Sequence, residues 1–424
     1  MNLQVIKNFF IYAFGAFLLK GIAVFIAPIV MRILNPADYG LLSLITNFIN
    51  ILFTCAGLGL RQLLAMEYFH CDTIGRKKVI VDIILVYVVA AVPIFILLFF
   101  NVTFINRFVF FNQATTFIIS FCLIIAFMKF FVELFYQILQ YTGEASILTG
   151  IQVAAALIII VLNLTFLYKF NWGIFSIVAA QFTSIFLVLL ISIYFFISQL
   201  YYVHLNVACS VKKSAAYIKK GLPFVPRVLF AWVLAMGDRW VLAKYATMTD
   251  VGIYSVADMF GQLFQMVIII PLSYAYIPYL MEKFASNKDR LLSVDRWNLK
   301  NMVITMVFLF LAVSVGFVVC KPLVSFVLPQ KYHLAMQYIW SLLMGYIFLL
   351  GTYFASGLLH FKKCIYFLLV SLLVPAVFNI GLNMLLVPSF AIWGCVIATF
   401  LSYLLYFLII IGYNVYFKKT LKTP

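Results

Sequence analysis

RILNPADYGLLS, residues 32–43, is a polar interruption in an otherwise apolar part of the chain. It separates two long apolar runs, and its charges, proline and glycine predict a tight polar turn. A similar stretch, KYATMTDVGIYS, returns at residues 244–255, and the offset of 212 residues is half of the 424-residue chain. The matched polar and glycine positions are Arg32 with Lys244, Asp38 with Asp250, Gly40 with Gly252 and Ser43 with Ser255, and upstream Lys7 with Lys219. The alternative is coincidence between two ordinary turns.

The composition indicates the class of protein. Apolar residues make up 66% of the chain and charged residues 10%, whereas soluble proteins carry about 25% charged residues. This predicts an all-α integral membrane protein with many spans. The net charge of +17 comes without an RRM, zinc-finger or basic-arm pattern, so no nucleic-acid partner is expected. The seven cysteines form no C-x-x-C motif and predict neither a disulfide framework nor a metal site.

No signature of an enzyme is present. The sequence lacks a Walker A loop, an H-E-x-x-H motif and a G-x-S-x-G motif, and each of these carries a specific chemistry. We therefore expect that the protein has no cofactor and does not hydrolyse ATP.

Twelve apolar runs are long enough to span a membrane as helices, which takes about 20 residues each. A β-barrel is excluded because the runs are long and do not alternate. The predicted spans are 9–30, 41–66, 79–100, 116–140, 146–168, 174–200, 222–243, 251–281, 301–320, 337–360, 364–386 and 391–417.

The connecting segments predict the orientation of the chain. Connections on the side of the termini contain 18 Lys and Arg residues, and those on the other side contain 6. Because cytoplasmic loops are enriched in these cations, both termini are predicted to be cytoplasmic. The segment 201–221, with its lysine pairs and aromatic residues, is predicted to be a cytoplasmic linker, either an amphipathic helix on the inner leaflet or a solvated loop. It separates two lobes of six spans, 1–200 and 222–424, related by a pseudo-twofold axis along the membrane normal.

Five cations lie inside the apolar runs: Lys20, Arg61, Lys129, Arg227 and Arg239. A charge facing lipid at mid-membrane costs about 2.5–3.5 kcal/mol, so these side chains are expected to face protein or water. Three acids are embedded with them: Glu133, Asp238 and Asp258.

The spacing of these charges predicts some of their partners. Lys129 and Glu133 are four residues apart and are predicted to pair on one helix face. Asp238 and Arg239 are adjacent, so their side chains should point about 100° apart and not face each other. Arg227 is predicted to share a helix face with Asp238, at a different depth.

Two interpretations of the embedded charges stay open. In the first, the cations pair across helices and hold the bundle together, with Arg227 extending towards the interface. In the second, the five cations line a wet cavity for an anion such as a phosphate or diphosphate. The three acids could then bind H⁺ or a metal cation that drives transport.

Several stretches resemble a known family. FIAPIVMRILNPADYGLLSL (25–44), followed by GLGLRQ (57–62), resembles the start of O-antigen and polysaccharide-unit flippases of the Wzx type, members of the multidrug/oligosaccharidyl-lipid/polysaccharide (MOP) flippase superfamily. GDRWVLAKYATMTDVGIYSVADMF (237–260) and IPLSYAYIPYLMEKF (270–284) resemble the region that opens their second half.

The resemblance implies a MATE-like arrangement of two six-helix lobes in a bacterial cytoplasmic membrane. It also implies export of undecaprenyl-diphosphate-linked oligosaccharide by alternating access that is driven by ion antiport. Polysaccharide assembly proteins are the implied partners. Peptidoglycan-precursor flippases and drug/cation antiporters of the same fold are the nearest alternatives. A membrane glycosyltransferase, polymerase or ligase acting on the same lipids is the alternative from another class.

Overall fold

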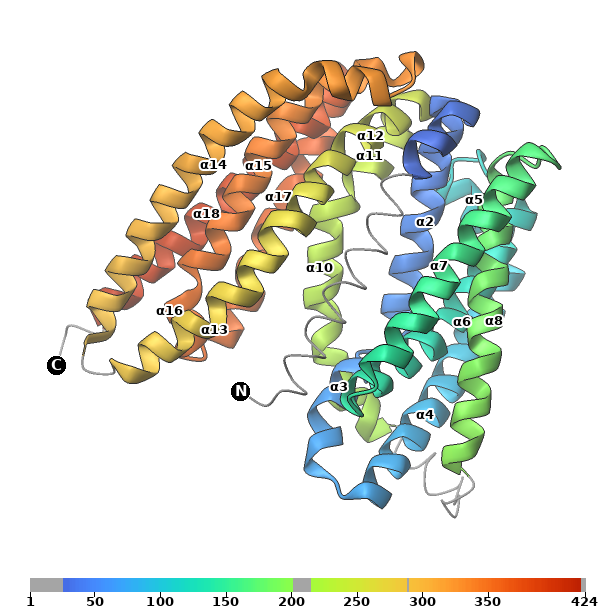
Figure 1. Cartoon of the computed structure of the whole chain (residues 1–424), viewed down its shortest axis with the longest axis horizontal. Coiled ribbons are helices and arrows are strands. Elements are labelled where there is room, and N and C mark those ends of the chain that lie inside the picture. The colour runs from blue at the N-terminus through green and yellow to red at the C-terminus, as the bar shows by residue number, and fades with distance from the viewer. Residues whose placement is uncertain (1–25, 201–214, 288–289, 421–424) are drawn as a thin grey trace. The chain divides into compact units, whose positions relative to one another are not determined.

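The computed structural model describes residues 26–200, 215–287 and 290–420, and every regular element in these ranges is a helix (Figure 1). The chain divides into two compact units, residues 1–229 and 230–424. The lobe limits inferred from the sequence, 1–200 and 222–424, stay a prediction, because residues 201–214 of the linker lie outside the described ranges.

In the first unit, one helix lies at the centre. α6 packs against α2, α4 and α8, and α8 packs in turn against α7. Of the residues in the most apolar part of each helix, 56% are buried in α6 and 11% in α7. The helices are α2 (Pro36–Ala56), α3 (Leu60–Glu67), α4 (Thr73–Phe100), α5 (Val102–Val109), α6 (Thr116–Tyr141), α7 (Ala145–Tyr168) and α8 (Ile174–Leu200), with the short η1 (Tyr68–His70) after α3.

The second unit repeats this packing. α15 packs against α12, α14 and α18, and α18 packs against α17 (Figure 1). The core is formed by buried side chains such as Leu350 and Phe354 of α15 and Leu372 of α17. The helices are α11 (Asp238–Tyr245), α12 (Met248–Phe264), the π-helical η3 (Gln265–Ile269), α13 (Ile270–Ser286), α14 (Leu291–Val327), η5 (Gln330–Ala335), α15 (Met336–Ala355), α16 (Gly357–Phe361), α17 (Ile365–Phe390) and α18 (Ile392–Thr420).

The repeated turns of the sequence cap equivalent helices. Asn35 precedes α2, and its side chain accepts a hydrogen bond from the backbone N–H of Asp38 at 2.8 Å. Thr247 precedes α12 and accepts one from the N–H of Asp250 at 3.1 Å, and Asp250 completes a capping box. Each cap satisfies orphan donors at a helix start. Asn35 and Thr247 are 212 residues apart, so the local structure agrees with the predicted repeat.

The helices are long enough to cross a membrane in most of the predicted places. Ten described helices meet the length and apolarity of a span, or eleven when the bent pair Ala215–Met236 and Asp238–Tyr245 counts as one. These eleven correspond to predicted spans two to twelve. Most of predicted span 9–30 lies outside the described residues, so the count of twelve stays a prediction.

Two predicted spans are interrupted at glycines. Predicted span 41–66 breaks between α2 and α3, where Gly59 has a φ of 70°. A Cβ at Gly59 would lie 2.1 Å from the carbonyl oxygen of Gly221, so this close backbone approach requires glycine. Predicted span 222–243 bends by 49° at Gly237, between α10 (Val225–Met236) and α11. Each break places a charged residue, Arg61 or Arg239, in the first turn of the helix that follows.

Candidate functional site

The first unit contains a polar cluster among its apolar helices, here called the Arg61 cluster. It consists of Asn50 and Phe53 of α2, Arg61 of α3, and Lys129, Glu133 and Gln137 of α6. The three α6 residues are spaced by four and therefore follow one face of that helix. The break at Gly59 turns the chain so that Arg61 lies beside this face.

Arg61 is held by two side chains of α6. Its Nη2 lies 3.3 Å from Oε2 of Glu133, and its Nε donates to Oε1 of Gln137 at 3.2 Å. The Gln137 amide donates back to the Arg61 carbonyl oxygen at 2.9 Å and to the Tyr141 hydroxyl at 2.6 Å. The guanidinium is thus fixed by a neutral amide as well as by the carboxylate.

Lys129 has a different partner from the one predicted. Its Nζ donates to Oδ1 of Asn50 at 2.7 Å, and within the described ranges Lys129 forms no ion pair. The predicted pairing of Lys129 with Glu133 is therefore wrong. The physical reason is that Arg61 reaches the Glu133 carboxylate from a neighbouring helix, with a guanidinium that suits a carboxylate better than a lysine does. The Phe53 ring lies beneath both cations, 5.6 Å from Arg61 Cζ and 5.4 Å from Lys129 Nζ.

The Arg61 cluster is partly exposed and carries more positive than negative charge. The side chains of Arg61 and Glu133 are 32% and 31% exposed, and the cluster contains two cations and one acid. Because such charges are costly against lipid, the exposed side of this cluster is expected to face water or a polar ligand. The arrangement can bind an anion through the guanidinium and the ammonium together.

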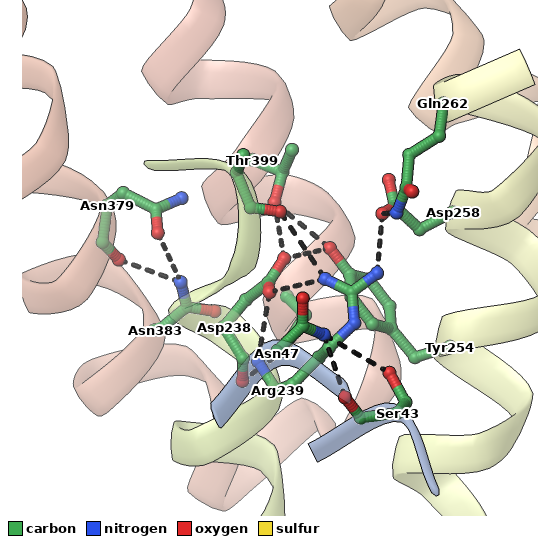
Figure 2. Close-up of polar contacts among 12 residues, drawn as sticks. Ser43, Asn47, Asp238, Arg239, Tyr254, Asp258, Gln262, Asn379, Asn383 and Thr399 are labelled. Carbon is green, nitrogen blue, oxygen red and sulfur yellow. Dashed lines mark hydrogen bonds and ion pairs between the residues drawn. The ribbon is translucent and has the colours of Figure 1, made fainter. Parts of the chain in front are cut away.

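The second unit contains a different polar cluster, here called the Arg239 network. It joins Asp238 and Arg239 of α11, Tyr254, Asp258 and Gln262 of α12 and Thr399 of α18 (Figure 2). Tyr346 of α15 also belongs to it, through a hydrogen bond to Asp258. Asp238, Arg239 and Asp258 are each at most 2% exposed. This network is therefore buried, unlike the Arg61 cluster.

Arg239 bridges the two acids of this network. Its Nη2 lies 2.6 Å from Oδ2 of Asp258, and its Nη1 lies 3.2 Å from Oδ1 of Asp238. The prediction that Asp238 and Arg239 do not face each other is wrong. The helix bends at Gly237, so Asp238 begins α11 and accepts the N–H of Arg239 at 2.9 Å. The long arginine side chain then folds back to the same oxygen. The predicted angle of about 100° describes only the directions in which two adjacent side chains leave a helix, and not where a long side chain ends.

The remaining oxygens of both acids also have donors. Asp238 Oδ2 accepts from the hydroxyls of Tyr254 and of Thr399, the latter at 3.3 Å. Asp258 accepts from Gln262 at 2.7 Å and from Tyr346 at 2.9 Å. With both acids ionised the network carries one more negative charge than positive, and a buried excess charge is unfavourable. The network is therefore suited to take up one cation, such as a proton.

The predicted site residues fall into separate groups. Arg61, Lys129 and Glu133 share the Arg61 cluster, and Arg239, Asp238 and Asp258 share the Arg239 network. Arg227 is exposed on α10, and Lys20 lies outside the described residues. The predicted common face of Arg227 and Asp238 is wrong, because the 49° bend at Gly237 interrupts the helix between them.

Several members of both clusters were not expected from the sequence. Gln137 follows Glu133 by four residues and Gln262 follows Asp258 by four, so a search for polar residues at one-turn spacing would have found both. Asn50, Tyr346 and Thr399 come from distant helices and give no local signal. In the part of the chain that the structure describes, no group of three or more His, Cys, Asp and Glu residues could hold a metal ion.

Comparisons with known proteins agree with this architecture. A family model described as polysaccharide biosynthesis protein matches residues 5–284. No curated protein matches the chain.

Solved structures share the fold over nearly the whole chain. An inward-facing multidrug-resistance MATE-family transporter of the MOP superfamily has a TM-score of 0.73 at 16% identity, covering 96% of this chain and 95% of its own. The lipid II flippase MurJ, in an inward closed conformation, has a TM-score of 0.72 at 14% identity, covering 97% and 87%. A MOP-superfamily transporter from Pyrococcus furiosus, described as having a binding pocket of reverse polarity, has a TM-score of 0.59 at 13% identity, covering 99% and 97%.

These similarities agree with the all-helical membrane architecture and with the MATE-like fold expected from the sequence. The family model covers more than half of the chain, including the two stretches of the 212-residue repeat. The chain therefore belongs to the polysaccharide biosynthesis protein family and has the fold of the MOP-superfamily transporters.

Proposed function

We propose that the protein is a flippase for saccharides linked to a polyprenyl diphosphate. It moves an undecaprenyl-diphosphate-linked oligosaccharide, such as an O-antigen or related repeat unit, from the cytoplasmic to the outer leaflet by alternating access. The family membership and the fold shared with a lipid II flippase support a lipid-linked substrate. The observation that carries the proposal is the partly exposed Arg61 cluster, which contains two cations and one acid.

The diphosphate is the group that the Arg61 cluster would bind. Arg61 offers paired N–H donors and Lys129 a compact point charge, which together suit phosphate oxygens. Lys20 and Arg227 are proposed to add to this positive surface, as their position in predicted spans suggests. A fixed cationic surface replaces the water that the diphosphate loses on entering the protein, so the head group can cross without a large desolvation cost.

The two ends of the substrate need different surroundings during transport. The saccharide is polar and would cross in a wet cavity. The polyprenyl tail would stay in the bilayer, because each CH₂ group moved into water costs about 0.8 kcal/mol. The protein therefore has to provide polar surroundings only for the head group.

The Arg239 network is the proposed coupling site, with Asp238 and Asp258 as the residues that bind the driving ion. Two buried acids share one guanidinium, so one added H⁺ or Na⁺ would neutralise the network. The hydroxyls of Tyr254 and Thr399 that donate to Asp238 can also accept a hydrogen bond from a protonated carboxyl, whereas a metal ion needs several vacant oxygen ligands, so a proton is favoured. Arg239 was predicted to bind substrate, and its burial favours this coupling role instead. Glu133 stays a proposed second coupling acid.

We place the protein in a bacterial cytoplasmic membrane with both termini in the cytoplasm. The distribution of 18 and 6 cations between the two sides supports this orientation. Segment 201–221 is the proposed cytoplasmic linker between lobes 1–200 and 222–424. Polysaccharide assembly proteins are the proposed partners, and no cofactor is required.

A drug/cation antiporter is the second candidate. It is favoured by the similarity to a multidrug-resistance transporter and by the two buried acids of the second unit. Such a protein would bind organic cations, for which the surplus of positive charge in the Arg61 cluster is unfavourable. The two candidates therefore differ in the sign of the charge on the ligand.

Glycan export from cells distinguishes these candidates. Arg61→Ala should abolish export of the polysaccharide while the protein stays in the membrane, and Arg61→Lys should restore part of it, because the charge survives without the paired donors. Expression and export are measured in the same cells. Normal export by a normally expressed Arg61→Ala variant would remove this cluster from the mechanism, and resistance to organic cations that needs Asp258 would favour the antiporter.

A further inference from the structure

Glu133 pairs with one of two available cations. Its carboxylate lies 3.3 Å from Arg61, while Lys129 lies one helical turn away on the same face of α6. Lys129 uses one hydrogen-bond donor, to Asn50 at 2.7 Å, and an ammonium has three. Two cations and one acid between them therefore allow two pairings within the same cluster.

Arg61 would keep its position without Glu133. Gln137 accepts from Arg61 Nε at 3.2 Å and donates to the Arg61 carbonyl oxygen at 2.9 Å. The Phe53 ring supports the guanidinium from one side, with its centroid 5.6 Å from Cζ. The terminal donors of Arg61 thus stay positioned for another anion when the carboxylate leaves.

We infer that Glu133 is an internal counter-ion that occupies Arg61 until a phosphate group of the substrate displaces it towards Lys129. This inference rests on the proposed function, because it assigns the Arg61 cluster to a phosphate-bearing ligand. The carboxylate and the phosphate present the same kind of paired acceptor oxygens, so they compete for one guanidinium.

The exchange has two consequences for transport. First, Arg61 never stands unpaired within the membrane, where an isolated charge is unfavourable. Second, binding is weakened by the competing carboxylate, so the ligand can leave once it has crossed. When Glu133 leaves Arg61, it pairs with Lys129, which precedes it by four residues on the same helix. This is the less favourable order, so the carboxylate returns to Arg61 afterwards.

The test measures binding of inorganic diphosphate to the full-length protein in lipid nanodiscs by calorimetry at low salt. Glu133→Gln keeps the shape of the side chain and removes its charge, so it should tighten diphosphate binding about threefold to tenfold. The matched control is Glu67→Gln, which removes the same charge from an ion pair of the same unit, that with Lys220 at 2.8 Å. The control should leave the dissociation constant within about twofold.

Lys129→Gln separates the role of Lys129 as receiver of Glu133 from direct binding of the ligand. If it receives Glu133, its substitution should weaken binding about threefold or more in the presence of Glu133, and clearly less in the Glu133→Gln background. Equal losses in the two backgrounds would show that Lys129 acts only on the ligand and does not receive Glu133, which would overturn the exchange.

Failure of this inference can be told apart from failure of the proposed function. If Glu133→Gln binds diphosphate no more tightly than the wild type, and the wild type exports glycan, the counter-ion role is wrong and the flippase stands. If neither protein binds diphosphate and neither exports glycan, both proposals are wrong.

Discussion

Replacing Arg239 by methionine removes the cation that bridges Asp238 and Asp258. The change eliminates contacts of 2.6 Å and 3.2 Å to the two carboxylates and one of 3.3 Å to the Ala235 carbonyl oxygen. Both acids stay at most 2% exposed and lose their counter-charge. Breaking a buried ion pair from one side costs about 3–5 kcal/mol, so Arg239→Met should lower the free energy of unfolding by that amount.

The charge balance predicts a smaller effect for Asp258→Asn. This variant leaves Arg239 paired with Asp238 and costs mainly the hydrogen bonds from Gln262 and Arg239, about 1–3 kcal/mol. Replacing both acids by asparagine in the Arg239→Met background should recover part of the lost stability, because the uncompensated charges are gone.

Denaturant unfolding of the purified protein in detergent micelles measures these differences. Lys244→Met is the matched control, since it removes an exposed cation from the same helix, α11 and should change stability by less than about 0.5 kcal/mol. The reasoning would be refuted if Arg239→Met were no more destabilising than this control, or less destabilising than Asp258→Asn.

Three further predictions concern other parts of the molecule. Reporter fusions after Lys169 and after Lys213 should report opposite sides of the membrane, and the same side for both would contradict the predicted topology. Gly59→Ala should strongly destabilise the protein, because a Cβ there meets the Gly221 carbonyl oxygen at 2.1 Å. In the control variant Gly150→Ala, on α7, the added Cβ meets nothing within 4 Å, so the change should be neutral or stabilising by about 1 kcal/mol. Equal unfolding free energies for the two variants would argue against the close approach of Gly59 to Gly221. Amide substitution of Glu133, Asp238 and Asp258 together should make transport in vesicles independent of an imposed ion gradient, and fully gradient-dependent transport in that variant would exclude all three from coupling.

Local features of the fold were predictable because their causes are local. The turns at Asn35 and Thr247 contain their own caps, so the start of α2 and of α12 follows from short motifs. The apolar runs predicted the eleven candidate spans that the structure describes, ten single helices and one bent pair, because the membrane sets their length. The breaks at Gly59 and Gly237 were harder to predict, because the hydropathy profile does not change at a single glycine.

The partners of the charged residues were harder to predict. Glu133 has a cation one turn away in Lys129, yet it pairs with Arg61 from another helix. Asp238 contacts Arg239 only because the chain bends at Gly237 and the arginine side chain is long enough to fold back. Such contacts depend on how helices pack, and one sequence without its fold does not specify which of several cations reaches a given acid.

Translocation by the purified protein in liposomes is the decisive measurement for the proposed flippase. A fluorescent oligosaccharide linked to a polyprenyl diphosphate is placed in one leaflet, and its appearance in the other is followed with and without an imposed pH gradient. We predict gradient-accelerated translocation that Arg61→Ala abolishes, and no translocation of the same saccharide on a polyprenol that lacks the diphosphate. Equal translocation of the two lipids, or equal rates for the wild type and Arg61→Ala, would contradict a flippase that recognises its substrate by the diphosphate.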